Sequence, residues 1–311
     1  MTSDLSLAPQ THGTSRKITI KTAIKMQRLI IACSLTLITT LAQSASPQDT
    51  TPNNTSLSRA EALRVITLTP HLTELLYELN AGKLIVGTVE FSGYSEKTKT
   101  IPLVGTGIHV SLEKIVALKP DLVLAWSSGM NPSLIESLKR ANISVHISDT
   151  QTIEHFMKDI NTIGSLIQRE KEAHALVRKI KSTINDISAY QNEASAFIQV
   201  WPKPLYTVGK PQIITQALSL CGVRNIFGDI TAESTQVSIE AVLARKPNWI
   251  IQTASSTDPV DNEPSLLKGL QRTTPTIRTT LLSRPNLGFF KEVKRICQVI
   301  HSQTKKAITN L

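Results

Sequence analysis

One sequence pattern occurs twice in this chain, and it limits the folds that the chain can adopt. The first copy, SLEKIVALKPDLVLAW, runs from Ser111 to Trp126, and the second, SIEAVLARKPNWIIQT, runs from Ser238 to Thr253. Both copies have Ser, Glu, Ala, Lys and Pro at the same places. Most other positions exchange one aliphatic residue for another, or Asp for Asn. A pattern repeated at this distance predicts two related structural units.

Each copy is typical of a short helix followed by a buried strand. Ser111 is a suitable N-cap residue, and the Lys-Pro pair ends the helix because a residue before proline is disfavoured in helical conformation. Glu113 and Glu240 therefore lie in the first turn of two equivalent helices. A carboxylate there interacts favourably with the positive end of the helix dipole and stabilises the helix by about a few tenths of a kcal/mol. Helix stability alone can account for both glutamates.

Strands and helices alternate around both copies. RVITL, from Arg64, is a predicted buried strand, and TPHLTELLYELNAG is a predicted helix with Thr69 as its N-cap and Gly82 as its C-terminal stop. Such alternation is typical of parallel sheets covered by helices. We expect an N-terminal α/β lobe at 63–151 and a C-terminal α/β lobe at 192–311.

Residues 152–191 are predicted to join the lobes as one long helix. Apolar residues recur at steps of three and four from Ile153 to Ile187, no proline interrupts them, and the only glycine is Gly164. A helix of this length spans roughly 50 Å, which is too long for a crossover within one small sheet. The alternative is two helices with a break near Gly164 or Arg169. The expected fold is therefore α/β: two lobes with parallel sheets, one long connecting α-helix, and a ligand cleft between the lobes.

The first 45 residues are predicted to be an export signal. A short basic KMQR segment precedes the apolar core Leu29–Ala42, which is too short for a comfortable membrane span, and small residues suited to cleavage follow. The polar segment before Met26 adds nothing to a signal, which favours Met26 as the true start. A lipoprotein cleavage site before Cys33 is the alternative, although it leaves almost no apolar core. Residues 46–62 are expected to form a flexible leader, and the mature protein to reside in the periplasm.

The charge and the motifs exclude other classes of function. Residues 1–45 account for +4 of the formal net charge of +10, and no dense Lys/Arg run follows them, so nucleic-acid binding is not expected. The sequence contains no GxSxG, no HExxH and no phosphate-cradling glycine loop, so we expect no enzymatic activity.

The cysteines fit an oxidising compartment. Cys33 belongs to the signal, and the mature chain keeps Cys221 and Cys297. An even pair in such a compartment is a disulfide candidate, and two separate buried thiols are the alternative. Neither cysteine has a neighbouring Cys or His at metal-ligand spacing, so no metal site is expected there.

From Arg64 to Ile300, the chain resembles the periplasmic binding proteins that serve ABC importers of vitamin B12, iron-siderophores and haem. Among these, it is most similar to the vitamin B12 binders. The motifs that carry the resemblance are RVITLTPHLTELL, FSGYS, SLEKIVALKPDLVLAW, YTVGK, LSLCGVRNIF, QVSIEAVLARKP and the RP before the last helix. The resemblance implies two α/β lobes joined by a long rigid helix.

The resemblance also gives a role to the repeated glutamates. Members of this family dock on a two-fold symmetric permease of the inner membrane through one glutamate on each lobe, and Glu113 and Glu240 match those positions. Arg–carboxylate pairs provide orientation and fast encounter. The resemblance further implies a structural disulfide between Cys221 and Cys297. We expect the protein to be a monomer.

Candidate ligand contacts lie at the strand ends, where ligands of such folds bind. They are His71, Phe91, Tyr94, His109 and Trp126 in the first lobe, and Trp201, Tyr206, Lys210 and Arg284 around the second. Tyr94 and Trp126 match aromatic positions of the vitamin B12 binders, and Tyr206 replaces a Phe there. Trp249 is expected to be a core residue.

The sequence differs from the vitamin B12 binders at two places, and these differences leave two classes of ligand to consider. Those proteins have a tryptophan before each docking helix, and Gly107 and Ser234 stand there in this chain. The polar signature before the last helix is also shortened, to Arg284-Pro285-Asn286. The expected ligand is cobalamin or a related corrinoid. The alternative is haem or a ferric siderophore, for which His71 and His109 could ligate the metal and Arg284 would attract an anionic chelate.

We therefore expect a transport component that binds a cobalt or iron chelate and has no resident cofactor. The alternative from another class of function is a scaffold or sensor protein that keeps this fold but no longer takes part in transport. The retained pair of glutamates favours transport.

Overall fold

The first sheet is entirely parallel, as predicted. The computed structural model describes residues 63–309 apart from 91–95, 107–108, 130 and 254–264. The strands lie in the order β3-β2-β1-β4-β5, with bounds Val65–Thr67 (β1), Ile85–Val89 (β2), Leu103–Gly105 (β3), Leu122–Trp126 (β4) and Ser144–Ser148 (β5). Helices α2 (Pro70–Glu78), α3 (Leu112–Ala117) and α4 (Pro132–Arg140) connect them, with 3-10 turns at Gly82–Leu84, Glu96–Thr100 and Ser127–Gly129. We call this sheet and its helices the first lobe.

The second sheet is mixed, so the prediction of two parallel sheets was wrong for it. Its order is β11-β10-β6-β7-β9, and β8 also pairs with β6. The bounds are Ala194–Pro202 (β6), Leu205–Val208 (β7), Val223–Asn225 (β8), Ser234–Gln236 (β9), Trp249–Gln252 (β10) and Thr276–Arg278 (β11). β7 runs antiparallel to both β6 and β9. Only Lys203 and Pro204 separate β6 from β7, and so short a connection permits only a hairpin.

Helices α7 (Ile213–Ser219), α8 (Ile239–Ala244) and α9 (Ser265–Thr273) accompany the second sheet, and together they form the second lobe. A 3-10 turn at Leu281–Ser283 leads into the last helix, α10 (Leu287–Thr309).

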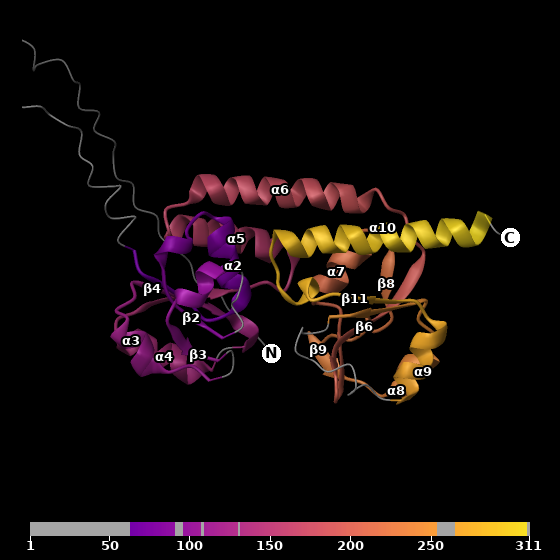
Figure 1. Cartoon of the computed structure of the whole chain (residues 1–311), viewed down its shortest axis with the longest axis horizontal. Helices are drawn as coiled ribbons and strands as arrows, with labels where there is room; N and C mark the ends of the chain where they lie inside the picture. Colours follow the sequence, from indigo (N-terminus) through magenta and orange to yellow (C-terminus); the bar gives the residue numbers. More distant parts are fainter. Residues whose placement is uncertain (1–62, 91–95, 107–108, 130, 254–264, 310–311) are drawn as a thin grey trace, which may run out of the picture. The chain divides into compact units, whose positions relative to one another are not determined.

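Two helices replace the single long helix predicted between the lobes. α5 covers Ile153–Leu166 and α6 covers Glu170–Ser188, which confirms the alternative of a break. Gln168 adopts a φ of 56°, and the Arg169 amide donates to the Gly164 carbonyl over 2.7 Å. A Cβ on Gly164 would lie 2.4 Å from the Ala173 Cβ, so this glycine permits the close approach of α6. Figure 1 shows α6 passing beside both α5 and α10.

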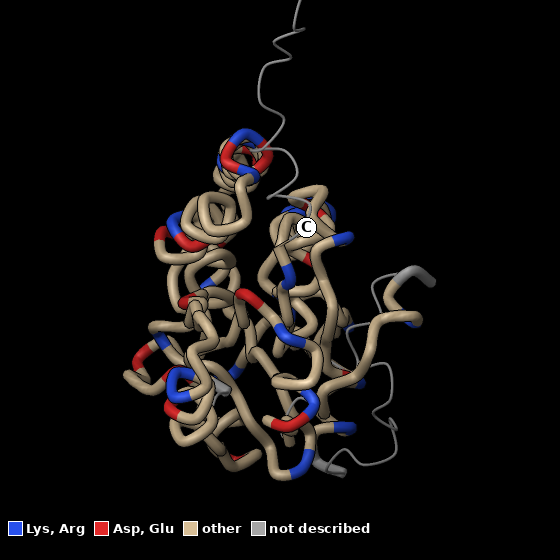
Figure 2. Tube along the Cα trace, turned by 90° about the vertical axis from the view of Figure 1, so that its left-hand side faces the viewer, with Lys and Arg blue, Asp and Glu red and all other residues tan. Residues whose placement is uncertain are grey.

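One apolar core cluster connects both sheets through α5, α6 and α10. It includes Val65 of the first sheet, Ile198 of the second, and Ile180 of α6. Phe156 of α5 stacks on Phe290 of α10 with ring centroids 6.1 Å apart. The outer surface of this layer is charged: Figure 2 shows acidic and basic residues mixed around α6, seen end-on at the top. The helices therefore provide a continuous packed backing for the two lobes.

Candidate ligand cleft and docking helices

The two sequence copies form the same helix in each lobe. Ser111 Oγ accepts from the Lys114 amide, and Ser238 Oγ accepts from the Ala241 amide, each over 3.2 Å. The predicted cap at Ser111 is therefore confirmed, and Ser238 caps α8 in the same way. In contrast, Thr69 makes no side-chain cap hydrogen bond at α2.

Each of these helices ends in the same way. The lysine of the Lys-Pro pair takes a left-handed conformation in both copies, with φ of 47° at Lys119 and 44° at Lys246. α2 ends differently from the prediction: its last residue is Glu78, and Asn80, with a φ of 55°, takes the left-handed position expected for Gly82. Asparagine tolerates this region better than most residues.

The Asp-for-Asn exchange in the pattern has a structural explanation. Asp121 Oδ2 accepts from the Arg64 amide over 2.7 Å, and Asn248 Oδ1 accepts from the Ser195 amide over 2.9 Å. Each side chain thus ties the start of its own strand to the first strand of its lobe. Both residue types suit this position because both offer a side-chain oxygen.

Glu113 and Glu240 occupy the second helical position of α3 and α8. Both residues are exposed, whereas the residues two places later, Ile115 and Val242, are fully buried. Within the described part of the chain, no ion pair engages either carboxylate. The two glutamates are therefore presented to solvent in the same way by equivalent helices.

A pocket of about 650 Å³ receives side chains from both lobes. The first lobe and the segment after it contribute Trp126, Ser128 and Thr150; the second contributes Val200, Trp201, Val208, Gln212, Ile214, Glu233, Ser234, Thr253 and the 280–285 segment. Two indole rings, several aliphatic side chains and many hydroxyl groups thus surround one space. Such a mixture, with an apolar wall and a few polar groups, is typical of ligand sites.

Trp126 is held in place from two sides. Its Nε1 donates to Thr150 Oγ1 over 3.0 Å, and the His71 ring meets its indole edge-on with centroids 5.5 Å apart. His71 is buried and is not among the described residues that line the pocket. Burial, and secondarily the positive charge of Arg284, lower the pKa of His71 to about 4. His71 therefore supports Trp126 as a neutral ring.

Arg284 lines the pocket and also pairs with the first lobe. Its Nη1 donates to Glu74 Oε1 over 2.6 Å, and Asn286 Nδ2 donates to the other carboxylate oxygen over 2.5 Å. Glu74 lies on α2, and its side chain is only 5% exposed. The negative charge of Glu74 therefore offsets the positive charge that Arg284 brings to the cleft.

Glu78, one turn further along α2, accepts from the Leu287 amide at the start of α10. Desolvation, and to a smaller extent the nearby Glu74, raise the pKa of Glu78 to about 7, against the lowering effect of that hydrogen bond. Together with Arg284 and Asn286, this contact fastens α2 to the segment that begins α10.

Sequence reasoning missed Glu233, whose carboxylate bridges the lobes at the pocket. Ser128 Oγ donates to Glu233 Oε2 over 2.9 Å, and Gln151 Nε2 donates to Glu233 Oε1. Nothing in the local sequence distinguishes this residue from other polar loop residues. Its position beside Ser234, which the family comparison placed before a docking helix, was the only available signal.

The other predicted contacts are not gathered together. Trp201 lines the pocket, and the half-buried Tyr206 is its partner in the β6–β7 register. His109 and Lys210 are exposed and do not line the pocket as described. Phe91 and Tyr94 lie outside the described residues. Trp249 is buried in the core, as predicted.

Cys221 and Cys297 form a disulfide, with Cα atoms 6.1 Å apart. Both residues are fully buried. The bond connects the segment just after α7 to the middle of α10, so it ties the second lobe to the helical backing. The alternative of two separate thiols does not apply.

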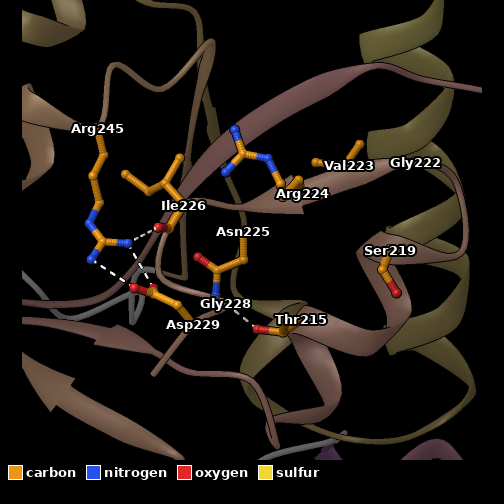
Figure 3. Close-up of a pocket in the computed structure, with 10 residues that line it drawn as sticks. All are labelled: Thr215, Ser219, Gly222, Val223, Arg224, Asn225, Ile226, Gly228, Asp229 and Arg245. Carbon is orange, nitrogen blue, oxygen red and sulfur yellow. Dashed lines mark hydrogen bonds and ion pairs between the residues drawn. The ribbon is translucent and has the colours of Figure 1, made fainter. Parts of the chain in front are cut away.

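A second pocket, of about 700 Å³, lies within the second lobe alone. Figure 3 shows that Arg245 reaches Asp229 and the Ile226 carbonyl there, with 2.5–3.0 Å between the bonded atoms. The Arg245 guanidinium also lies 4.5 Å from the centre of the Phe227 ring. The charged side chains of this pocket are engaged in stabilising the loop after β8. The cleft with two tryptophans is therefore the better candidate for a ligand site.

Within the described residues, no helix is both long and apolar enough to cross a membrane. No group of three or more His, Cys, Asp or Glu side chains in this part of the chain is arranged to hold a metal ion.

Two α/β lobes with a pocket between them and a common helical backing define a two-lobed solute-binding protein. The chain belongs to the family of periplasmic binding proteins, whose model matches residues 65–280. Members of this family are non-catalytic components of transport and work with an ABC permease and a small ligand. The predicted family and the predicted absence of catalysis are thereby confirmed.

Three members of the family illustrate which proteins this chain is similar to. The chain is 31% identical over 210 residues to the vitamin B12-binding protein of Yersinia pestis (strain Pestoides F), covering 67% of this chain and 75% of that protein. The periplasmic vitamin B12 binding protein of Vibrio cholerae has a similar structure, with a TM-score of 0.65, 26% identity, and coverage of 76% and 96% of the two chains. A possible iron-binding protein of Staphylococcus epidermidis gives a TM-score of 0.62, 27% identity, and coverage of 76% and 98%.

Proposed function

We propose that this protein captures cobalamin or a related corrinoid in the periplasm and delivers it to an ABC permease. The observation that supports this most is the composition of the cleft, where Trp126 and Trp201 stand among hydroxyl and amide side chains. A corrinoid presents a flat macrocycle with peripheral carboxamides, which match aromatic surfaces and neutral hydrogen-bonding groups. The relatives named above as vitamin B12-binding proteins support the same ligand class.

The charge of the cleft favours a corrinoid over an anionic chelate. Arg284 is the only basic side chain among the described lining residues, and Glu74 pairs with it, while Glu233 adds a negative charge. An anionic ligand would gain little attraction here. Haem or a ferric siderophore in the same transport role is the second candidate, and the likeness to the Staphylococcus epidermidis protein favours it.

Ligand titration of the purified mature protein, followed by tryptophan fluorescence, tests this proposal. We expect cyanocobalamin to quench the emission with saturation. Trp126→Ala and Trp201→Ala should each weaken binding by about tenfold or more, because a stacked ring contributes about 1 kcal/mol beyond its buried area. Trp249→Phe, in the core, is the matched control and should bind as the unmodified protein does. Saturable binding of haem or a ferric siderophore without cobalamin binding would favour the second candidate.

The proposed partner is a two-fold symmetric permease of the inner membrane, contacted by Glu113 and Glu240. Their equivalent presentation on α3 and α8 supports this role. Pull-down with the cognate permease in nanodiscs should succeed with the unmodified protein and fail with Glu113→Ala/Glu240→Ala, while ligand affinity stays unchanged. A large loss of ligand affinity would contradict the docking role. A protein that binds ligand but no permease would instead be a scaffold or sensor.

We further propose that residues 1–45 direct export and are removed, that 46–62 form a leader, and that the mature protein is a monomer that binds no nucleic acid. The two lobes are assigned to 63–151 and 192–311, with 152–191 between them. Mass spectrometry of the exported protein should find an N-terminus near Ser46. A lipid-modified Cys33 at the N-terminus would contradict the proposed cleavage.

A further inference from the structure

The two proposed docking helices share an exposed apolar residue as well as a glutamate. Seven large apolar side chains are exposed among the described residues. Two of them, Val116 at 45% and Leu243 at 39% exposure, occupy the same position in the two copies of the repeated pattern. The other five lie outside the helices of that pattern. Single exposed apolar residues are common on protein surfaces. Their general frequency does not explain why two of them occupy matching positions on equivalent helices.

Each of these side chains lies on the same face as its glutamate. Val116 follows Glu113 by three positions, and Leu243 follows Glu240 by three, which places both pairs on one side of their helix. The alanines that follow, Ala117 and Ala244, are also exposed. Each helix therefore presents a carboxylate, a branched aliphatic group and a methyl group together.

The packing of both helices orients this face identically. Ile115 and Val242, at matching positions, are fully buried and fix the rotation of α3 and α8. The serine caps and the left-handed lysines fix where each helix starts and stops. In Figure 1 both helices lie in the lower half, on the side away from α6.

Other positions of the two copies differ in character. Lys114 corresponds to Ala241, and Leu118 corresponds to Arg245. A charge thus appears in one copy and not in the other at both places. The face with Glu, the exposed aliphatic and Ala keeps its chemistry in both.

We propose that Val116 and Leu243 are docking contacts, each entering an apolar depression beside a basic residue of the permease. This inference rests on the proposed function. The partner surface must carry two equivalent sites, each with a positive charge and an apolar hollow about one helical turn apart. The glutamates then govern the rate of encounter, and the aliphatic groups, once buried, slow dissociation.

Surface plasmon resonance against the cognate permease in nanodiscs tests this division of roles. Val116→Ser/Leu243→Ser should dissociate at least about tenfold faster than the unmodified protein, because burying two half-exposed side chains is comparable to fully burying one. Its association rate should stay within about twofold. Glu113→Ala/Glu240→Ala should mainly slow association and reduce its dependence on salt. Leu166→Ser, at another exposed apolar position (44%) on α5, is the matched control and should behave as the unmodified protein.

The outcomes separate this inference from the docking proposal itself. If the glutamate variant loses binding while Val116→Ser/Leu243→Ser dissociates like the Leu166→Ser control, the glutamates dock and the apolar contacts are refuted. If the unmodified protein does not bind the permease, both proposals are refuted. Unchanged melting temperature and cobalamin affinity in the serine variants show that the helices remain folded.

Discussion

Arg284 Nη1 lies 2.6 Å from Glu74 Oε1, and this ion pair joins the segment before α10 to helix α2 of the first lobe. The carboxylate is almost completely buried, while the guanidinium is 34% exposed. Removing one partner of such a pair leaves a buried charge without compensation, which is more costly than the pair is stabilising.

We therefore expect Arg284→Ala to lower the free energy of unfolding by about 2–4 kcal/mol. Glu74→Gln/Arg284→Gln, which removes both charges, should cost less than Arg284→Ala alone. Urea unfolding at neutral pH measures both. The exposed pair Glu136–Lys139 provides a control, because Lys139→Ala should change stability by no more than about 0.5 kcal/mol. Equal effects of Arg284→Ala and Lys139→Ala would contradict the assignment.

Glu233 is expected to hold the two lobes at one separation. In Glu233→Ala, the hydrogen bonds from Ser128 and Gln151 are lost, so the distribution of distances between the lobes should widen. Spin labels at Lys139→Cys on α4 and Arg272→Cys on α9, measured by double electron–electron resonance, report this distance. Glu233→Gln keeps one acceptor oxygen and should give an intermediate width. An identical distribution in Glu233→Ala would show that the carboxylate does not restrain the lobes.

His71 should make the fold less stable in acid. Its pKa is about 4 in the folded protein against 6.5 in the unfolded chain, so between these values only the unfolded chain binds the proton. Stability therefore falls as pH falls from 6.5 to 4, by about 3 kcal/mol in total. His71→Gln should remove this dependence in urea unfolding at pH 7, 5.5 and 4.5. The half-exposed His155, replaced by Gln, is the control and should leave the slope in place.

Glu78 should act in the opposite direction. Its folded pKa is raised to about 7, so the folded protein holds a proton that the unfolded chain releases between pH 4.5 and 7. Stability contributed by the protonated carboxyl is present below pH 4.5 and declines as pH rises to 7, by about 1–2 kcal/mol for a partly buried group. Glu78→Gln should flatten this decline, whereas the exposed Glu136→Gln should not. A decline that persists in Glu78→Gln would assign it to another group.

The disulfide between Cys221 and Cys297 closes a segment of 76 residues. Chain entropy predicts a stabilisation of about 4.5 kcal/mol for a loop of this length, and native disulfides typically contribute about 2–5 kcal/mol. Cys221→Ala/Cys297→Ala should lower the free energy of unfolding by an amount in that range. Thiol titration of the denatured mature protein should find no free thiol before reduction and two after it. Free thiols before reduction would exclude the bond.

Local sequence signals predicted the elements that local chemistry determines. The repeated pattern predicted the Ser111 cap of α3 and the positions of Glu113 and Glu240, because capping and helix termination depend on neighbours a few residues away. The break between α5 and α6 was given only as the alternative to one long helix. The left-handed residue is Gln168 rather than a glycine, and the apolar periodicity continues on both sides of it.

The cleft was predictable only in part. Trp126, Trp201 and Arg284 were expected there and line it, since strand ends and family motifs indicate the general location. The contacts that set its charge, Arg284 with Glu74 and Glu233 with Ser128, join residues 210 and 105 positions apart. No local pattern encodes such pairs, because they depend on how the two lobes meet.

The duplicated face on α3 and α8 also has a statistical consequence. A two-fold symmetric receptor is unchanged by a half-turn, so a protein that engages both of its sites can land in either of two equivalent orientations. Both orientations are productive, so the probability of a successful collision doubles, which is equivalent to about 0.4 kcal/mol of binding free energy. The duplicated face allows both sites to be engaged at once, and residues that differ between the copies, such as Lys114 and Ala241, do not distinguish the two orientations, because the symmetry of the receptor makes them identical.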